Sequence, residues 1–296
     1  MILNPEANQG RGRRFEAPIR AAAARHGELT LRLTQAAGEA EVLARQAAEE
    51  GYDVVVAAGG DGTVHEVVNG LYTAQAAAAL GVIPIGSGND FAYANGIAAE
   101  VETAVARLFG GRARTVDLGR IEDGRGRTRV FDNNFGLGFD ARVVVETQKV
   151  TRVHGFMMYL TAVLRTLLYY YDRPRIVVEF DGEAVAQAVL FLAMGIGPRG
   201  GGGFLLVPDA RADDDLIDSC TVNPIGRLQM LWMIPKTLKG THVTSPHVTM
   251  RRSRRICIEM TEPAPIHIDG EIFCNAHDGV RQVTVTSLPG ALRVMV

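Results

Sequence analysis

The sequence predicts an α/β domain at residues 1–118 followed by a β-rich domain at residues 119–296. A chain of 296 residues exceeds the usual size of one hydrophobic core, so two packed domains are expected. Strand-like runs alternate with helix-like Ala-, Arg- and Glu-rich segments in the first part, whereas short strand-like runs between turn residues dominate the second. The second domain is therefore expected to be a sandwich, and the last residues of the chain are candidates for packing back on the first domain.

The alternation in residues 1–118 favours a layer of parallel strands with helices between them. The expected helices are 14–26, 36–50, 64–71 and 101–109, and the expected strands are 29–33, 53–58 and 82–85. Gly110 and Gly111 follow the last of these helices and indicate where it ends.

Residues 119–296 contain a series of runs with strand character, at 129–135, 175–180, 184–194, 218–222, 247–250, 256–260 and 282–286. The one helix expected there, 156–171, is apolar but carries Arg165 near its centre, and it is shorter than the roughly 20 residues that span a bilayer. This helix is expected either to reach a membrane surface, to line a pocket or to pack in the core. Any membrane contact is therefore expected to be peripheral.

Composition argues against several classes of protein. The 31 basic residues nearly cancel the 33 acidic ones, so nothing indicates binding to nucleic acid. Cys220, Cys257 and Cys274 form no CxxC pair, which argues against a disulfide framework and against a zinc site. Because neither a basic leader nor a signal-like apolar stretch follows Met1, a cytoplasmic location is expected.

The strongest chemical signal is the run at 54–63, in which a strand leads through Gly60, Asp61 and Gly62 to Thr63 and a helix. Glycines let the backbone approach phosphate oxygens, and the helix N-terminus offers unpaired N–H groups. A carboxylate beside phosphates requires a cation between them, so Asp61 implies magnesium. Taken alone, the run could be a tight turn whose aspartate caps the helix.

A second turn of similar design, at 83–92, also follows a short apolar strand and contains Ser87 and Asp90. Parallel strands would bring both turns to the carboxyl edge of the sheet, where open α/β sheets bind their ligands. A third motif, at 266–271, ends in Asp269 and Glu271. On a strand these carboxylates would share one face and could orient water or accept a proton from an alcohol, although Asp-Gly alone is more often a hairpin turn.

With these three motifs in order, and Asn4-Pro5 before them, the chain closely resembles the bacterial diacylglycerol kinase-like lipid kinases. That family shares its nucleotide-binding domain with NAD kinases and phosphofructokinases, so the resemblance implies an NAD kinase-like first domain. Further matching segments are 66–70, 134–141 and the glycine run 200–203 followed by 208–210. The likeness covers essentially the whole chain.

The resemblance implies a set of site residues. ATP would be surrounded by Asn4, Pro5, Glu6, Ala7, Asn8, Thr34, Gly60, Asp61, Gly62, Thr63, Val64, His65, Glu66 and Ser87. Asp61 and Asp90 would organise Mg²⁺ and water, and Asp269 and Glu271 would hold the catalytic position, with the choice of general base between the last two left open. A helix-surface position is expected for His65.

A second, structural magnesium is also implied by the resemblance. Its ligands would be the side chain of Asp214 and the backbone carbonyls of Arg211 and Leu216. The family usually has glycine where this chain has Asp215, a residue that tolerates unusual backbone geometry less easily. A solvated turn is the alternative interpretation of these adjacent aspartates.

The expected function is therefore transfer of the γ-phosphoryl group of ATP to a lipid hydroxyl, with diacylglycerol giving phosphatidic acid as the leading case. The expected partners are ATP and a membrane lipid reached by peripheral membrane contact, and the resemblance suggests a homodimer. Two alternatives are an NAD kinase-like small-molecule kinase and a regulator that binds nucleotide or lipid without turnover. An NAD phosphorylation assay separates the first from a lipid kinase.

Overall fold

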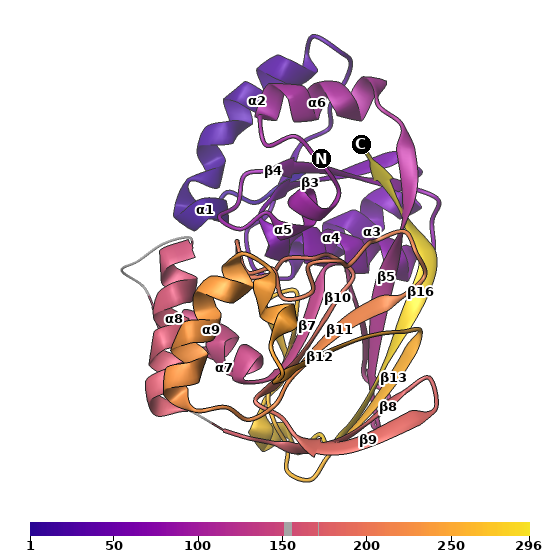
Figure 1. Ribbon diagram of the computed structural model, residues 1–296. Coiled ribbons are helices and arrows are strands. Elements are labelled where there is room, and N and C mark those ends of the chain that lie inside the picture. Colours follow the sequence, from indigo (N-terminus) through magenta and orange to yellow (C-terminus); the bar gives the residue numbers. More distant parts are fainter. Residues whose placement is uncertain (151–155, 171) are drawn as a thin grey trace. The chain divides into compact units, whose positions relative to one another are not determined.

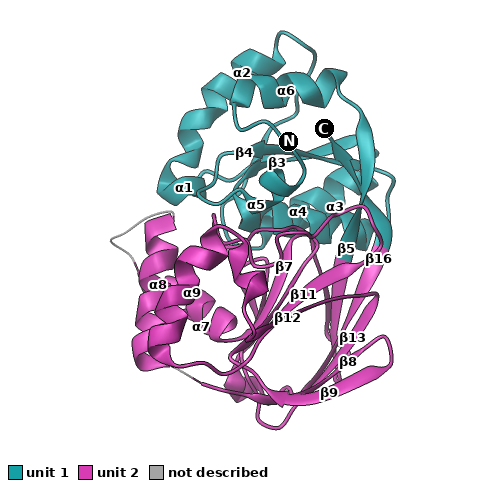
Figure 2. Cartoon of the chain, viewed as in Figure 1, with its two compact units in different colours: residues 1–118, 289–296 teal, residues 119–288 magenta. Residues whose placement is uncertain are grey.

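The computed structural model describes residues 1–150, 156–170 and 172–296, which form two compact units (Figures 1 and 2). Unit 1 comprises Met1–Leu118 together with Pro289–Val296, and unit 2 comprises Gly119–Leu288. Strands β5 (Ala113–Asp123) and β16 (Gln282–Met295) each contribute residues to both units.

Unit 1 is built on parallel strands in the order β2, β1, β3, β4, followed by the end of β16, where Val294 pairs with Leu80. The bounds are β1 Ile2–Leu3, β2 Arg32–Leu33, β3 Val54–Gly59 and β4 Ala79–Pro84. All of β3 after Val54 is buried, as expected for a Val- and Ala-rich strand of a parallel sheet that is covered on both faces.

Helices pack against this sheet, and two of them begin just after its strands end. They are α1 (Ala7–Gly10), η1 (Gly12–Phe15), α2 (Glu16–Ala23), α3 (Glu39–Glu49), α4 (Asp61–Ala74), α5 (Asp90–Ala94) and α6 (Val101–Gly110). Ile19 of α2 and Val105 of α6 pack with Leu3, Val56 and Ile83 of the strands in one apolar cluster. The first turns of α4 and α5 follow β3 and β4 closely, so both helices begin at the carboxyl edge of the sheet.

Unit 2 is a sandwich of two antiparallel layers. One layer has the strand order β12, β11, β10, β7, β14, β15, and the other contains β16, β13, β8 and β9 with β5 and β6. Side chains of both layers, among them Phe135, Leu137, Val178 and Ile258, form one buried apolar cluster. The bounds are β6 Thr128–Phe131, β7 Asn134–Gly138, β8 Arg175–Phe180, β9 Glu183–Ala188, β10 Phe191–Gly195, β11 Ile217–Val222, β12 Val248–Ser253, β13 Arg255–Met260, β14 Ile266–Ile268 and β15 Glu271–Cys274.

Three helices lie on the same side as the β7–β12 layer of unit 2 (Figure 1): α7 (Phe139–Thr147), α8 (Phe156–Tyr169) and α9 (Arg227–Leu238). Phe139, Val163 and Met230, one from each helix, pack with Phe191 and Cys220 of the sheet in a second apolar cluster. Two short 3-10 helices complete the unit, η2 (Thr241–Thr244) and η3 (Ala276–Asp278).

The predicted fold class, an α/β part with parallel strands and a β-sandwich, is confirmed, but three details of the second part were wrong. The expected strands 129–135 and 184–194 are each two strands, because at 132–133 and 189–190 the chain crosses from one layer of the sandwich to the other. The expectation of a single helix missed α7 and α9. Of the expected helix 156–171, residue 171 lies outside the described residues.

Candidate functional site

The first glycine turn joins the end of β3 to the start of α4. Gly60 is the extended residue that precedes the helix, and Asp61 lies in the first helical turn. Asn4, at the end of β1, donates from Nδ2 to the Thr63 hydroxyl at 3.0 Å, and its backbone N–H donates to the carbonyl of Ala58 at 3.0 Å. The side chains that follow β1 and β3 are thus held together at one edge of the sheet.

The turn after β1 is tightly folded. The Asn4 Oδ1 atom accepts a hydrogen bond from the backbone N–H of Glu6 at 2.9 Å. Asn8 and Gln9 adopt left-handed backbone conformations, with φ of 51° and 62°. Asparagine tolerates this region better than most residues, and such backbone strain is often found at ligand-binding sites. The segment that the resemblance assigns to ATP is therefore a defined turn beside Thr63.

The second glycine turn meets the first at close range. Asn89 braces this turn, since its Oδ1 accepts from the Gly86 N–H at 3.0 Å and its Nδ2 donates to the Gly86 carbonyl at 3.1 Å. A Cβ atom added to Gly86 would collide with the Cα atom of Gly60. In addition, the N–H of Phe91 donates to Asp61 Oδ1 at 3.2 Å. The two predicted turns therefore form one contiguous site within unit 1.

Asp61 and Asp90 concentrate negative charge in this site. Burial of the Asp61 carboxyl, followed by the nearby charge of Asp90, raises the pKa of Asp61 to about 6, although backbone N–H donors at residues 89–91 partly offset the rise. Two carboxylates at the start of α4 and α5 are the oxygen donors that Mg²⁺ prefers, and a cation would relieve their repulsion. The residues present therefore fit a magnesium ion.

The other residues expected near ATP have different surroundings. The Glu66 carboxylate accepts from the N–H groups of Gly38 at 2.8 Å and Ala40 at 3.0 Å, so it anchors the start of α3. Thr34 is buried and its N–H donates to the carbonyl of Leu3 at 3.0 Å. Ser87 is exposed in the second turn. His65 is buried rather than on the helix surface, so that expectation was wrong.

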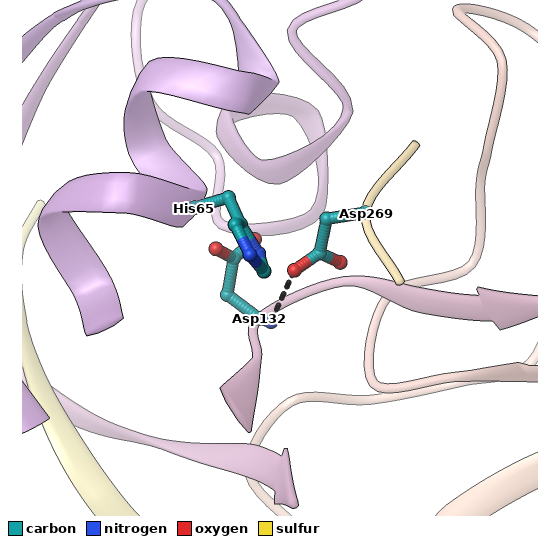
Figure 3. Close-up of side chains that lie close together, drawn as sticks. All are labelled: His65, Asp132 and Asp269. Carbon is teal, nitrogen blue, oxygen red and sulfur yellow. Dashed lines mark hydrogen bonds between the residues drawn. The ribbon is translucent and has the colours of Figure 1, made fainter. Parts of the chain in front are cut away.

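Asp269, in unit 2, has a structural task that its sequence motif did not reveal. Its carboxylate accepts three backbone hydrogen bonds, from Asp132 at 3.0 Å, Asn133 at 3.0 Å and Asn134 at 2.8 Å. Figure 3 shows the first of these bonds, and it also draws His65, which belongs to α4 of unit 1. The buried carboxylate thereby fixes the crossing between β6 and β7.

Asp269 and Glu271 do not share one face of a strand, so that expectation was wrong. Asp269 and Gly270 form the two-residue turn of the hairpin between β14 and β15, both with positive φ, 49° and 82°. Left-handed conformations at both positions are typical of an Asp-Gly hairpin turn. Glu271 is the exposed first residue of β15. The two carboxylates therefore differ in environment, one buried among backbone donors and one facing solvent.

Two aspartates of the acidic loop expected to hold a second magnesium are paired with arginine side chains from another part of unit 2. Asp214 accepts from the Leu216 N–H at 3.2 Å and is paired with the Arg252 guanidinium, while Arg254 lies 3.4 Å from Asp215. Asp215 adopts φ of 67°, the conformation for which glycine would be favoured. Both oxygens of Asp214 are thus engaged by protein donors. Arg252 therefore lies where a metal ligated by Asp214 would compete with it, and the second magnesium stays a prediction.

Unit 2 also contains a narrow apolar pocket of about 40 Å³. Its lining comes from α7, α8, α9 and the sheet and includes Phe139, Val163, Phe191, Phe204, Met230 and Ile234. Asp140 is a polar group in this lining, and its carboxylate accepts from the Tyr159 hydroxyl at 3.1 Å and lies 3.0 Å from His267 Nε2. Asp140 lay in a matching segment of the sequence, yet no site role was predicted for it.

Comparison with known proteins defines the class. The protein-family model for the diacylglycerol kinase catalytic domain matches the sequence at residues 1–121. The family model for the YegS C-terminal NAD kinase beta sandwich-like domain matches it at residues 134–296. A diacylglycerol kinase from Staphylococcus carnosus (strain TM300) is 30% identical over 240 residues, covering 80% of this chain and 76% of that protein. A protein of Pseudomonas aeruginosa (strain PAO1) named "Probable lipid kinase YegS-like" is 32% identical over 274 residues, covering 90% of this chain and 84% of that protein.

The fold agrees with these matches. The crystal structure of a diacylglycerol kinase from Bacillus anthracis strain Sterne superposes with a TM-score of 0.71 at 20% identity, covering 99% of this chain and 94% of that one. The chain therefore belongs to the diacylglycerol kinase family, whose named members here are lipid kinases.

Replacing Gly86 with alanine is expected to lower the free energy of unfolding by about 1–3 kcal/mol, because the new methyl group must push the two glycine turns apart. Gly110→Ala is the matched control, since no atom lies within 4 Å of a Cβ at that position. Urea denaturation of both variants measures the difference. Equal stability of the two variants would contradict the close approach.

Asp61→Asn is expected to raise the free energy of unfolding at pH 7.5 by up to about 2 kcal/mol and to change it little at pH 4. The folded-state pKa lies above the unfolded value, so the wild type loses stability from this group as pH rises from about 4 to 6. Urea denaturation at both pH values tests this, with the exposed Asp53→Asn as control. A gain of the same size at pH 4 would rule out the proposed cause.

Proposed function

We propose that this lipid kinase uses ATP and Mg²⁺ to phosphorylate the free hydroxyl of diacylglycerol, which gives phosphatidic acid. The observation that carries the proposal is the pairing of Asp61 and Asp90 where two glycine turns meet at two helix starts. Such a site offers backbone N–H groups to phosphates and carboxylates to the metal that accompanies them.

The nucleotide half of the site uses groups that unit 1 already holds in place. The N-terminus of α4, a helix of 14 residues, presents N–H groups and a favourable dipole to the phosphates. Thr63 is held by Asn4, so its hydroxyl has a fixed position for a phosphate oxygen or a water. The absence of a side chain at Gly60 and Gly86 lets the phosphates lie against the backbone.

Asp61 and Asp90 would hold the magnesium ion, which when bound neutralises charge on the transferring phosphoryl group. The raised pKa of Asp61 means that metal and proton compete for its carboxylate near pH 6. Phosphoryl transfer depends chiefly on position and on charge stabilisation. Asp61 is fixed for this task by the backbone N–H of Phe91.

The environments of the two acceptor-side carboxylates suggest separate roles. Because Asp269 accepts three backbone hydrogen bonds, its oxygens are committed to the turn at 132–134, and we assign it as a positioning residue. Glu271 is exposed and follows the hairpin turn directly, so we assign it as the base that accepts the hydroxyl proton. The apolar pocket in unit 2 supports a lipid acceptor, since acyl chains require an apolar lining.

The deciding experiment is transfer of radiolabelled phosphate from ATP with Mg²⁺ to diacylglycerol, sphingoid base, ceramide and phosphatidylglycerol in mixed micelles. Labelling of diacylglycerol supports the proposal, and labelling of another lipid corrects the acceptor. If no lipid is labelled while NAD is phosphorylated, an NAD kinase-like activity replaces the proposed lipid kinase activity. Binding of ATP with no labelled product at all would favour a regulator without turnover.

Glu271→Gln is expected to lower kcat at least about 100-fold with no change in the urea midpoint, because a general base contributes about that much. Asp269→Asn is expected to lower kcat and, in addition, to lower the free energy of unfolding by about 1–3 kcal/mol, since it weakens hydrogen bonds to a charged acceptor. The exposed Glu259→Gln serves as control for loss of a carboxylate. Full activity of Glu271→Gln would move the base elsewhere.

A further inference from the structure

Exposed apolar side chains gather on two helices of unit 2. Eight of the fourteen exposed large apolar side chains in the described part of the chain lie at 157–170 or 228–232. We define the α8–α9 face as Leu164, Leu168, Tyr169, Leu228, Leu231 and Trp232. Trp232 is 77% exposed and Leu228 75%. Patches of this kind on a soluble unit mark interaction sites rather than ordinary surface.

On α9 one stripe of apolar residues is exposed and another is buried. Leu228, Leu231 and Trp232 are three and four residues apart, so they lie on one stripe of α9. On the other side of the helix, Met230 and Met233 are buried in the core cluster. Both sides of α9 are therefore apolar, which the packing of unit 2 alone does not require.

The two stripes belong to one surface. Arg227, at the start of α9, lies within 3.5 Å of the Leu168 carbonyl near the end of α8 through its Nη2 atom. Val163 of α8 and Met230 of α9 pack in the same cluster and line the same pocket. Figure 1 shows the two helices next to each other.

The two helices themselves carry charge of one sign. Neither α8 nor α9 contains an aspartate or glutamate within its described bounds. Arg227, Lys236 and Lys239 are exposed on or beside α9, while Arg165 of α8 pairs with Glu146 at 3.2 Å. Basic groups beside exposed leucine and tryptophan complement an anionic lipid surface, where each contributes about 1 kcal/mol.

We propose that the α8–α9 face docks unit 2 on the surface of an anionic bilayer, with Leu228, Leu231 and Trp232 entering the headgroup region. This inference rests on the proposed function, because a diacylglycerol acceptor resides in a membrane. No helix within the described residues is long and apolar enough to cross a bilayer, so the contact lies at the interface. A second copy fits less well, since a two-fold contact would bring the same basic residues together.

The proposed docking face and the apolar pocket share helix α9. Met230 and Ile234 line the pocket from α9, while Leu228, Leu231 and Trp232 are exposed on the same helix. A shift of α9 on docking would therefore change the pocket wall directly. The cavity of about 40 Å³ is smaller than an acyl chain, so entry of a lipid requires some movement of its lining, which docking would favour.

Trp232 is the single tryptophan of the chain and reports on the proposed face without a label. Vesicles of phosphatidylglycerol with phosphatidylcholine are expected to shift its emission to the blue, and brominated lipids to quench it, with a weaker effect for phosphatidylcholine alone. Co-sedimentation gives the partition coefficient. Both measurements omit ATP and therefore do not depend on catalysis.

The double variant Leu228→Gln, Leu231→Gln is expected to lower partitioning about tenfold or more, because it removes the burial of two leucines. Val42→Gln is the control, an apolar residue on α3 of unit 1 that is about as exposed as Leu231. Lys236→Gln and Lys239→Gln are each expected to lower partitioning on anionic vesicles about fivefold and to leave phosphatidylcholine unaffected.

Unchanged emission and partitioning in the leucine variant would overturn the proposal, as would burial of Trp232 by self-association without lipid. Phosphorylation of a water-soluble short-chain diacylglycerol separates this outcome from failure of the proposed function. The leucine variant is expected to keep that activity while losing activity on vesicles. Vesicle binding by the wild type without phosphorylation of any lipid would contradict the proposed function but would still support the docking surface.

Discussion

The close approach of Gly60 and Gly86 is the constraint on which the proposed nucleotide site of unit 1 depends. Their backbones lie so near each other that a methyl group on Gly86 would collide with its neighbour. This contact brings Asp61 and Asp90 together at the starts of two helices and leaves room for phosphates against bare backbone. Asp61 is buried in this region, and its burial, followed by the charge of Asp90, raises its pKa, so the arrangement proposed for a cation also explains the raised pKa.

Much of this arrangement could be predicted from local sequence. Two apolar strands, each followed by a glycine turn and a helix start, indicate a parallel sheet with its ligands at the carboxyl edge. The rule that parallel strands end on one edge was enough to pair Asp61 with Asp90. It could not indicate that Glu66 is committed to the start of α3, because that depends on a helix 26 residues earlier in the chain.

Features set by distant contacts escaped prediction. The run 129–135 looks like one strand, yet the backbone N–H groups of Asp132 and Asn133 leave the ladder to bind a carboxylate 136 or more residues away. The sequence did not indicate that Asp269 also holds the crossing between two strands of the sandwich, and its expected part in catalysis stays a prediction. Helix α9 was missed because Pro235 lies within it and its outer stripe is apolar, so the usual alternation with polar residues is absent.

The final segment of the chain, Pro289–Val296, is part of unit 1. Its Gly290 N–H donates to Asp117 at 2.8 Å, and Val294 extends the parallel sheet beside Leu80. Unit 1 therefore cannot complete its sheet until residues 289–296 have been made, although the rest of its strands are made before unit 2. During synthesis the edge of β4 that later pairs with β16 is open while all of unit 2 emerges, and an open strand edge can pair with another chain.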